Sequence, residues 1–195
     1  LVGTGIADDA LPHLAGLVKL ERLHLGATKV TDAGMPHLVK LIRLRDLSLA
    51  DTAVTGKGLE QLKMLRRLRS IDLENCSEID NAAIAHVALL PRLETANLGG
   101  TQVTSDGLGQ LAGLKRLVTL FLNGTSVDDA GLEKLKACQK LEKLVLASTS
   151  VTDAGLVHLH DHPALKEVFL ADCEGVTDAG VERLKQALSG VKVQW

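Results

Sequence analysis

The sequence has almost no aromatic residues: among 195 residues there are two Phe, one Trp and no Tyr. A core made by this chain must therefore consist of aliphatic side chains, mainly Leu, Val and Ala. Cysteine is also scarce, and Cys76, Cys138 and Cys173 are odd in number and scattered along the chain. This usage does not fit a disulfide framework. It favours free, buried thiols in a reducing compartment, so we expect a cytoplasmic protein.

Neither sign of charge predominates, and no long hydrophobic run is present. The formal net charge is -2, which leaves no cationic footprint for nucleic acid, because binding to phosphates requires clustered Lys and Arg. No apolar stretch approaches the length that spans a bilayer, so we expect no membrane partner. No signal peptide is visible, and residue 1 lies in the middle of a repeat, so we expect a fragment of a longer chain.

The motifs of common catalytic sites are missing too. There is no Gly-x-Ser-x-Gly elbow, phosphate-binding loop or Rossmann fingerprint, so we assign no catalytic residue and expect a non-enzymatic protein without a cofactor. His158, His160 and His162 form a His-x-His-x-His stretch, in which the first and third would share a helical face as in some zinc sites. His162, however, stands where other repeats have Leu or Cys, and no third ligand is evident. We therefore expect no metal site.

What the sequence does contain is one unit repeated along its whole length. The string Val-Thr-Asp-Ala-Gly begins at Val30, Val151 and Val176, and successive units are spaced by 24 residues or one more. The predicted coils begin at Thr4, Thr28, Thr52, Cys76, Thr101, Thr125, Thr149 and Cys173. Self-similarity at this period predicts a solenoid of about eight stacked coils, forming a single domain over residues 1–195.

Each unit combines two periods. Alternation in Leu44–Leu49 predicts a short strand, and apolar residues at every third position in Met35–Leu41 predict a short helix. The residue before each Ala-Gly pair, or its equivalent, is expected to cap the helix: Asp8, Asp32, Gly56, Asn81, Ser105, Asp129, Asp153 and Asp178. A glycine near the helix start recurs at positions 34, 58, 107, 131, 155 and 180. It indicates either close approach of neighbouring coils or a positive φ.

The pattern Leu-x-x-Leu-x-Leu-x-x-Thr-x-Val-Thr-Asp-Ala-Gly-Leu resembles a leucine-rich repeat. It is most similar to the cysteine-containing subclass found in F-box substrate receptors and many bacterial proteins, with Cys76 and Cys173 in the cysteine position. This resemblance implies an α/β fold: a curved, right-handed solenoid, or horseshoe, with a parallel sheet on its concave face and short helices on its convex face. No F-box-like segment is present in these residues.

The outward residue of each predicted strand changes character along the sheet. In order these residues are His24, Ser48, Asp72, Asn97, Phe121, Val145, Phe169 and Gln194. The first half is polar, whereas Phe121, Val145 and Phe169 form an apolar run that includes both Phe residues of the chain. The polar residues expected to flank this run are Thr119, Lys143, Glu167 and Asn123. An exposed aromatic patch with a polar rim marks an interaction site more often than a folding requirement. The alternatives are packing against a segment outside this sequence, or β-propensity alone.

We therefore predict a non-enzymatic module that binds a protein partner on its concave sheet. The alternative is a sensing or substrate-receptor domain of a larger regulatory protein, such as a ubiquitin-ligase receptor, an effector or a kinase. Leu1, Ile6, Leu11 and Leu14 form an apolar N-terminal end that no coil covers. We expect a monomer, with this end as the surface through which copies could associate, and we expect Trp195 to cover the last coil.

Overall fold

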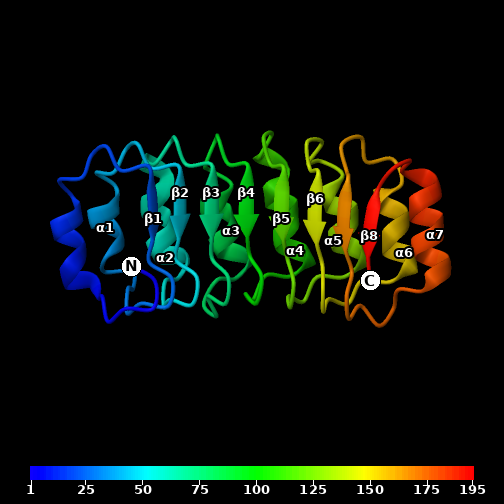
Figure 1. The fold of residues 1–195 in the computed structure, drawn as a ribbon, viewed down its shortest axis with the longest axis horizontal. Coiled ribbons are helices and arrows are strands. Elements are labelled where there is room, and N and C mark those ends of the chain that lie inside the picture. Colours follow the sequence, from blue (N-terminus) through cyan, green and yellow to red (C-terminus); the bar gives the residue numbers. More distant parts are fainter.

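The computed structural model describes residues 1–195 and shows a stack of coils, each contributing one three-residue strand to a single sheet (Figure 1). The strands are β1 Arg22–His24, β2 Asp46–Ser48, β3 Ser70–Asp72, β4 Thr95–Asn97, β5 Thr119–Phe121, β6 Lys143–Val145, β7 Glu167–Phe169 and β8 Lys192–Gln194. They pair in chain order, and every pair is parallel. Parallel pairing follows because every coil runs in the same direction and the helical segment supplies the crossover.

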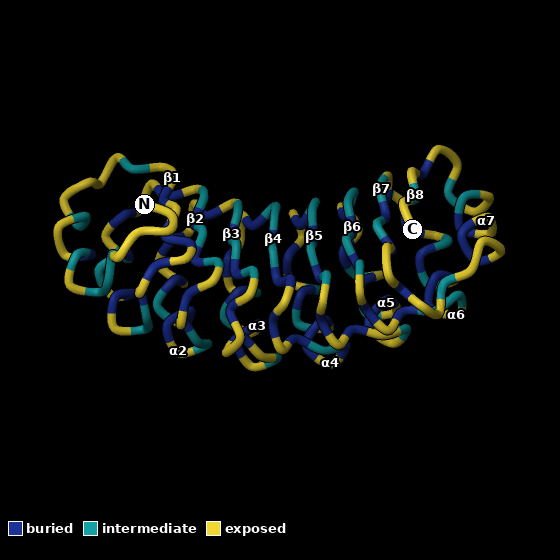
Figure 2. Tube along the Cα trace, turned by 60° about the horizontal axis from the view of Figure 1, so that its bottom comes forward, coloured by how far each residue is buried: buried dark blue, intermediate teal, exposed yellow.

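The segments between strands hold short helices. The α-helices are α1 Met35–Leu38, α2 Gly56–Leu59, α3 Asn81–Val87, α4 Ser105–Leu108, α5 Asp129–Leu135, α6 Asp153–Leu156 and α7 Asp178–Ala187. The 3₁₀ segments are η1 Asp8–Leu14, η2 Glu60–Met64, η3 Gly109–Gly113 and η4 Val157–Leu159. In Figure 2 the strands lie along the inner side of the arc and the helices along its outer side, so the predicted fold class is confirmed. None of the helices combines the length and apolar character that crossing a membrane requires.

The direction in which each strand residue points is also as predicted. In β2 to β7 the middle residue is buried and its two neighbours are half-buried. Leu120, for example, is fully buried, whereas Thr119 and Phe121 lie on the open face of the sheet. This alternation arises because successive side chains of a strand point to opposite faces.

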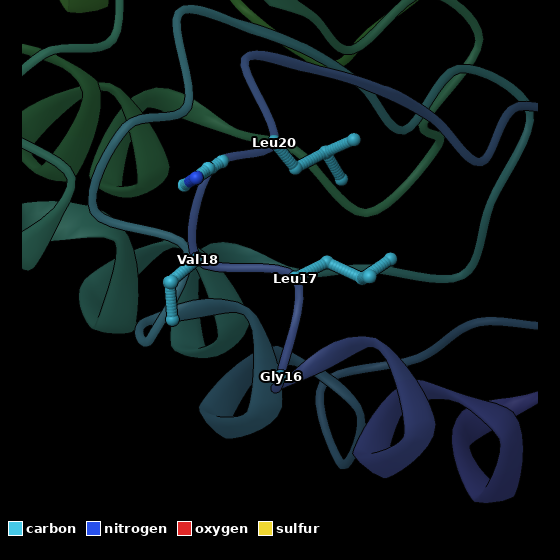
Figure 3. Close-up of a pocket in the computed structure, with 5 residues that line it drawn as sticks. Gly16, Leu17, Val18 and Leu20 are labelled. Carbon is cyan, nitrogen blue, oxygen red and sulfur yellow. The ribbon is translucent and has the colours of Figure 1, made fainter.

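The first coil shows what stacking buries. Leu17 is 49% exposed, whereas Leu41, the equivalent residue one coil later, is fully buried. An open apolar hollow of about 470 Å³, lined by Gly16, Leu17, Val18, Lys19 and Leu20, marks this end of the stack (Figure 3). Of the four residues predicted to form this end, only Leu1 is exposed; Leu11 is fully buried, and Ile6 and Leu14 are partly buried against the core.

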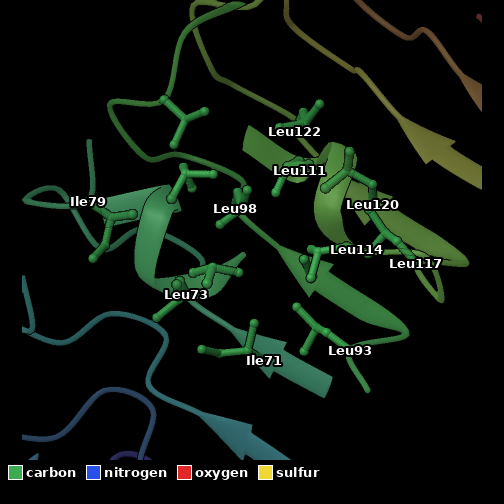
Figure 4. Close-up of a cluster of buried hydrophobic side chains, with 14 of the residues drawn as sticks. Ile71, Leu73, Ile79, Leu93, Leu98, Leu111, Leu114, Leu117, Leu120 and Leu122 are labelled. Carbon is green, nitrogen blue, oxygen red and sulfur yellow. The ribbon is translucent and has the colours of Figure 1, made fainter. Parts of the chain in front are cut away.

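In the inner coils these aliphatic side chains form one continuous core that runs the length of the stack. Figure 4 shows part of it, with residues from Ile71 to Leu122 labelled. A column of buried Thr residues lines its edge, and each hydroxyl donates to the carbonyl three residues earlier, as Thr52 Oγ1 does to Leu49 at 2.6 Å. Cys76 and Cys173 occupy the same column. Their Sγ atoms lie 3.1 Å from the carbonyls of Leu49 and Leu146 in the preceding coil, so the predicted burial of these thiols is confirmed.

The helix caps lie one residue earlier than predicted. The capping side chains belong to Thr55, Asp80, Thr104, Asp128, Thr152 and Thr177, each of which accepts from a backbone N–H in the first turn of its own helix. Thr152 Oγ1, for example, accepts from the N–H of Ala154 at 3.2 Å. Six of the residues predicted as caps instead occupy the first position of an α-helix, namely Gly56, Asn81, Ser105, Asp129, Asp153 and Asp178, whereas Asp32 lies three residues before α1. The prediction of the Asp column as helix caps was therefore wrong.

The column predicted as caps instead joins neighbouring coils. Asp129 accepts from the backbone N–H of Thr152 at 2.7 Å and from its hydroxyl at 2.7 Å, 23 residues away. Equivalent bonds join Asp8 to Thr31, Asp32 to Thr55, Asn81 to Thr104, Ser105 to Asp128, and Asp153 to Thr177. One side chain therefore satisfies a backbone donor and fixes the register between two coils.

The recurring glycines at the helix starts exist because of this contact. A Cβ added at Gly155 would overlap the carboxylate of Asp129, and Gly180 stands in the same relation to Asp153. Their φ angles are not positive, so close approach between coils, and not a left-handed conformation, explains them. The left-handed residues lie elsewhere: they close each strand turn, and they include Ala27 and Ser148 as well as Gly100 and Gly124.

Candidate functional site on the concave sheet

The apolar patch consists of Phe121, Val145 and Phe169, which face the open side of β5, β6 and β7. The strand register makes them direct neighbours in that order. Each is half-buried, and the residue beside it that points inward is a fully buried aliphatic residue such as Leu120 or Leu144. The core is thus complete without the patch, so these three side chains are available for contacts made from outside the coil.

Lys143 lies over the patch. Its Nζ is 4.6 Å from the ring centre of Phe169 and 5.8 Å from that of Phe121. A cation held over aromatic faces is attracted by their π electrons. Nζ also lies 3.7 Å from Oε2 of Glu167, the register neighbour of Lys143. The sequence placed Lys143 only in the rim, but its aliphatic stem and ammonium group cover part of the patch.

The remaining predicted rim residues lie on the same face. Thr119 is the register neighbour of Lys143, on the side away from Glu167. Asn123 lies beyond the end of β5, where its amide packs over Gly99 so closely that a Cβ on that glycine would lie 2.7 Å from it. The structure therefore brings together all seven residues predicted for this site.

The other half of the same face is polar and hydrogen-bonded. Ser48 Oγ donates to Oδ2 of Asp72 at 2.8 Å, and the backbone N–H of Glu74 donates to Oδ1 of Asp72 at 3.2 Å. Asn97 Nδ2 donates to Oε2 of Glu74 at 3.3 Å. Sequence reasoning did not single out Asp46 or Glu74 on this half. Alternation along the strand could have identified them, because Asp46 lies two residues before the outward residue Ser48 and Glu74 lies two residues after the outward residue Asp72.

Two comparisons with known proteins bear on this architecture. A family model described as "Leucine Rich repeat" matches residues 137–159. Among solved structures, the chain is similar to internalin C2 from Listeria monocytogenes, with 24% sequence identity and a TM-score of 0.79, over 99% of this chain and 77% of that one. The search of the curated proteins found no match.

The chain has the leucine-rich-repeat fold. Proteins that share one fold can bind many unrelated partners, so the fold alone does not identify a function. The site must be argued from its own side chains. Two groups of residues with recognisable chemistry, the pair His158 and His162 and the three cysteines, lie outside the concave face of this leucine-rich-repeat structure.

His162 replaces a core leucine of the repeat. Its side chain is 4% exposed, and neither ring nitrogen has a hydrogen-bond partner. Burial lowers the pKa of His162, an effect that the nearby backbone carbonyls of Cys138 and Leu135 partly oppose, so the ring is neutral at pH 7. His158 lines a small polar hollow on the helical side together with it, but no group of three or more His, Cys, Asp or Glu side chains is arranged to hold a metal ion.

The three cysteines are buried and free. Burial raises the pKa of Cys76, and raises that of Cys138 to about 11. Because the thiolate is the reactive form, thiols with raised pKa are poor nucleophiles at neutral pH. These cysteines act as small apolar residues of the leucine-rich-repeat core.

At the far end of the stack, Trp195 packs against α7. Its Nε1 donates to Oδ1 of Asp178 at 3.2 Å, and Nζ of Lys185 lies 4.6 Å from the ring centre. The side chain is nevertheless 50% exposed. Trp195 therefore covers the last coil only in part, less than the sequence predicted.

Proposed function

We propose that this chain is a non-enzymatic module that binds a protein partner on its concave sheet, with the Phe121–Val145–Phe169 patch at the centre of the contact. The observation that carries the proposal is the placement of both Phe residues of the chain on one open face. They lie two strands apart, with Val145 between them and a complete aliphatic core beneath. Folding does not require apolar residues at these outward positions, because Ser48, Asp72 and Asn97 occupy the equivalent positions in other coils.

The architecture supports this proposal in two ways. Solenoids form extended concave surfaces that suit the binding of large partners, and aromatic residues at the centre of an interface commonly carry most of its binding energy. The absence of a nucleophile–base pair in the sequence, together with the burial of all three thiols, favours a binding role over a catalytic one. The free thiols also favour the cytoplasm as the place where the protein acts.

The test compares two variants that remove equal numbers of apolar side chains. In Phe121→Ser/Phe169→Ser the patch is removed. In Leu89→Ser/Val157→Ser, residues that are 58% and 53% exposed on the helical side are changed instead. Affinity capture with the intact domain, followed by mass spectrometry, identifies a partner, whose affinity is then measured for each variant by titration calorimetry.

We expect the Phe variant to lose binding by at least thirtyfold, or about 2 kcal/mol, and the control to bind like the parent. The free energy of unfolding of the Phe variant should lie within about 1 kcal/mol of that of the parent, because the variant loses only the half-buried rings and the cation–π contacts of Lys143. A folded Phe variant that still binds its partner normally would place the site on the helices or the loops and contradict the proposal.

A second candidate is a sensing or substrate-receptor domain within a larger regulatory protein. The Leu-x-x-Cys spacing at Cys76 and Cys173 favours it, because the cysteine-containing subclass that it resembles includes such receptors, and both thiols lie in equivalent structural positions. The full-length gene product distinguishes the two candidates. A catalytic or F-box segment in that product would support the receptor role, and a product made only of repeats would support the stand-alone module.

A further inference from the structure

On the same face of the sheet, beyond β4, lies a region with three carboxylates that take part in no ion pair. Asp46, Asp72 and Glu74 lie on or just beyond β2 and β3, and none of them takes part in any ion pair of the structure. Arg22 is the register neighbour of Asp46, yet the two form no ion pair. This half of the face therefore holds three carboxylates without a cationic partner.

Two of these carboxylates border a hollow in the sheet surface. It measures about 180 Å³ and is lined by His24, Asp46, Leu47, Ser48, Ser70 and Asp72. Asp72 is held in one orientation, because it accepts from Ser48 and from the backbone N–H of Glu74. The fixed carboxylate of Asp72, the free carboxylate of Asp46 and the hydroxyls of Ser48 and Ser70 together offer several hydrogen-bond acceptors to one donor group that carries several N–H bonds. Such a set matches a guanidinium or an ammonium group.

We propose that the partner is a protein segment that places a Lys or Arg side chain in this hollow and an apolar side chain on the Phe121–Val145–Phe169 patch. This inference rests on the proposed function and specifies the chemistry of its partner. Charge complementarity selects the cation, because a neutral or acidic group in the hollow would leave the two carboxylates unpaired. The strand between the two regions, β4, presents only Thr95 and Asn97, which carry no charge that would oppose the segment.

The geometry of the sheet fixes the spacing within such a segment. The hollow is centred on β2 and the patch on β6, four strand spacings apart, or about 19 Å at roughly 4.8 Å per strand. A helical segment would separate its basic and apolar anchors by about 13 residues, because each residue advances roughly 1.5 Å. An extended segment would need about 6 residues at roughly 3.3 Å each.

The probe is a phage-displayed library of random 16-residue peptides, selected on the intact protein at low salt. Selected peptides are then synthesised and titrated by fluorescence anisotropy against three variants. Asp46→Asn/Asp72→Asn neutralises the hollow while preserving its shape. Phe121→Ser/Phe169→Ser removes the patch. Glu78→Gln/Glu133→Gln removes the same amount of charge from exposed side chains outside the concave face.

We expect the selected peptides to combine a basic residue with an apolar one at one of the two spacings. The Asp46→Asn/Asp72→Asn variant should bind them about tenfold more weakly and with a flatter dependence on salt. The Glu78→Gln/Glu133→Gln control should change affinity less than twofold. If the double Asn variant is less stable than the parent, Asp46→Asn alone replaces it in the titration. The Asp46 side chain accepts no hydrogen bond in the structure, so this single change should not affect folding.

Two other outcomes separate this inference from the proposed function. Peptides that require Phe121 and Phe169, carry no basic residue and bind the Asn variant normally would overturn the basic-segment inference and leave the proposed function standing. Peptides that ignore both pairs of substitutions, or the absence of any selected peptide, would overturn both.

Discussion

The junctions between coils are of two kinds, and the difference shows what specifies the stack. Where a coil opens its helix with Thr, the preceding coil supplies a carboxylate or an amide, as Asp129 does to Thr152. Where the coil opens with Asp80 or Asp128, the preceding coil supplies Gly56 or Ser105 instead. Ser105 donates to Asp128, and Gly56 leaves Asp80 free to cap its own helix. No carboxylate faces another carboxylate at any junction.

Side-chain volume follows the same complementarity. At the junctions that carry Asp, Asn or Ser, the facing position of the next coil is glycine, because a Cβ there would collide with that side chain. Opposite Gly56 the facing residue is Ala83, whose Cβ would lie 3.2 Å from a Cβ added to the glycine. The repeat is therefore specified across junctions as much as within coils, and residues 26 or 27 positions apart are coupled.

Gly155→Ala should produce the largest effect among the substitutions that break this comparison. Its new methyl group would overlap the carboxylate of Asp129, and overpacking of this kind costs about 1–3 kcal/mol. Adding Asp129→Gly copies the Gly56–Ala83 pair and should recover part of the loss, although the two hydrogen bonds to Thr152 disappear. Chemical denaturation of both single variants and the double variant measures this coupling.

The control for this cycle is Gly155→Ala combined with Asp8→Gly, which lie in coils that do not touch. Their effects on the free energy of unfolding should add to within about 0.5 kcal/mol. Additivity in the Asp129–Gly155 pair as well would show that the two residues are not coupled, and the interpretation of the recurring glycines would be wrong.

Asp153 tests the polar half of the comparison and its dependence on pH. Hydrogen bonds from the backbone N–H and hydroxyl of Thr177, with a smaller contribution from Arg183, hold the pKa of Asp153 below its usual value. The charged form therefore stabilises the fold above the unfolded-state pKa of about 3.9, and this contribution is lost as pH falls through the lower folded-state pKa.

Asp153→Ala should lower the free energy of unfolding by about 0.5–1.5 kcal/mol at pH 7, because its two hydrogen bonds from Thr177 are lost and water replaces them only in part at this exposed position. The difference between variant and parent should shrink as pH falls below 4. Urea denaturation at pH 7 and at pH 3 provides the measurement. Asp161→Ala, which removes an exposed carboxylate that takes part in no hydrogen bond or ion pair, is the control, and an equal effect from it would remove the special role of the junction.

His162→Leu tests a position at which one coil has a polar residue in the core where other coils have leucine. The buried ring has no hydrogen-bond partner, so leucine should raise the free energy of unfolding by about 1 kcal/mol at pH 7. Because the folded-state pKa of His162 is lowered, the parent loses stability as pH falls through about 6.5, where the unfolded state gains a proton. Thermal melts between pH 7.5 and 5 should show a shallower decline in the leucine variant than in the parent.

Ala27→Gly should have the smallest effect. Ala27 closes the first strand turn with a φ of 52°, in the left-handed region where a Cβ is unfavourable. Glycine at the equivalent positions 100 and 124 adopts this conformation freely. The variant should be stabilised by up to about 1 kcal/mol, partly offset by the greater entropy of glycine in the unfolded chain. A loss of stability in denaturation experiments would contradict this account of the turn.

The sequence was sufficient for the fold and for the direction of every strand side chain, because both follow from periods that a single chain displays. The helix caps were misplaced by one residue. Thr and Asp are both good caps, and only the structure shows that Asp129 reaches into the next coil while Thr152 caps its own helix. Lys143 could be placed beside the patch but not over it, since the conformation of a long side chain is set by neighbours on two other strands. The hollow beside Asp46 could not be predicted from the sequence, because residues of three neighbouring strands line it.

The junction chemistry also limits which edits of length this stack can tolerate. Excision of the coil Thr149–Asp172 would bring Asp129 against Thr177, a pairing of the kind already present in the protein. Excision of Thr52–Asn75 would bring Asp32 against Asp80 and leave two carboxylates face to face. Only some repeats of such a chain can therefore be duplicated or lost without placing two carboxylates at one junction. The third coil, which carries Gly56, can therefore be lost only together with the fourth, which carries Asp80.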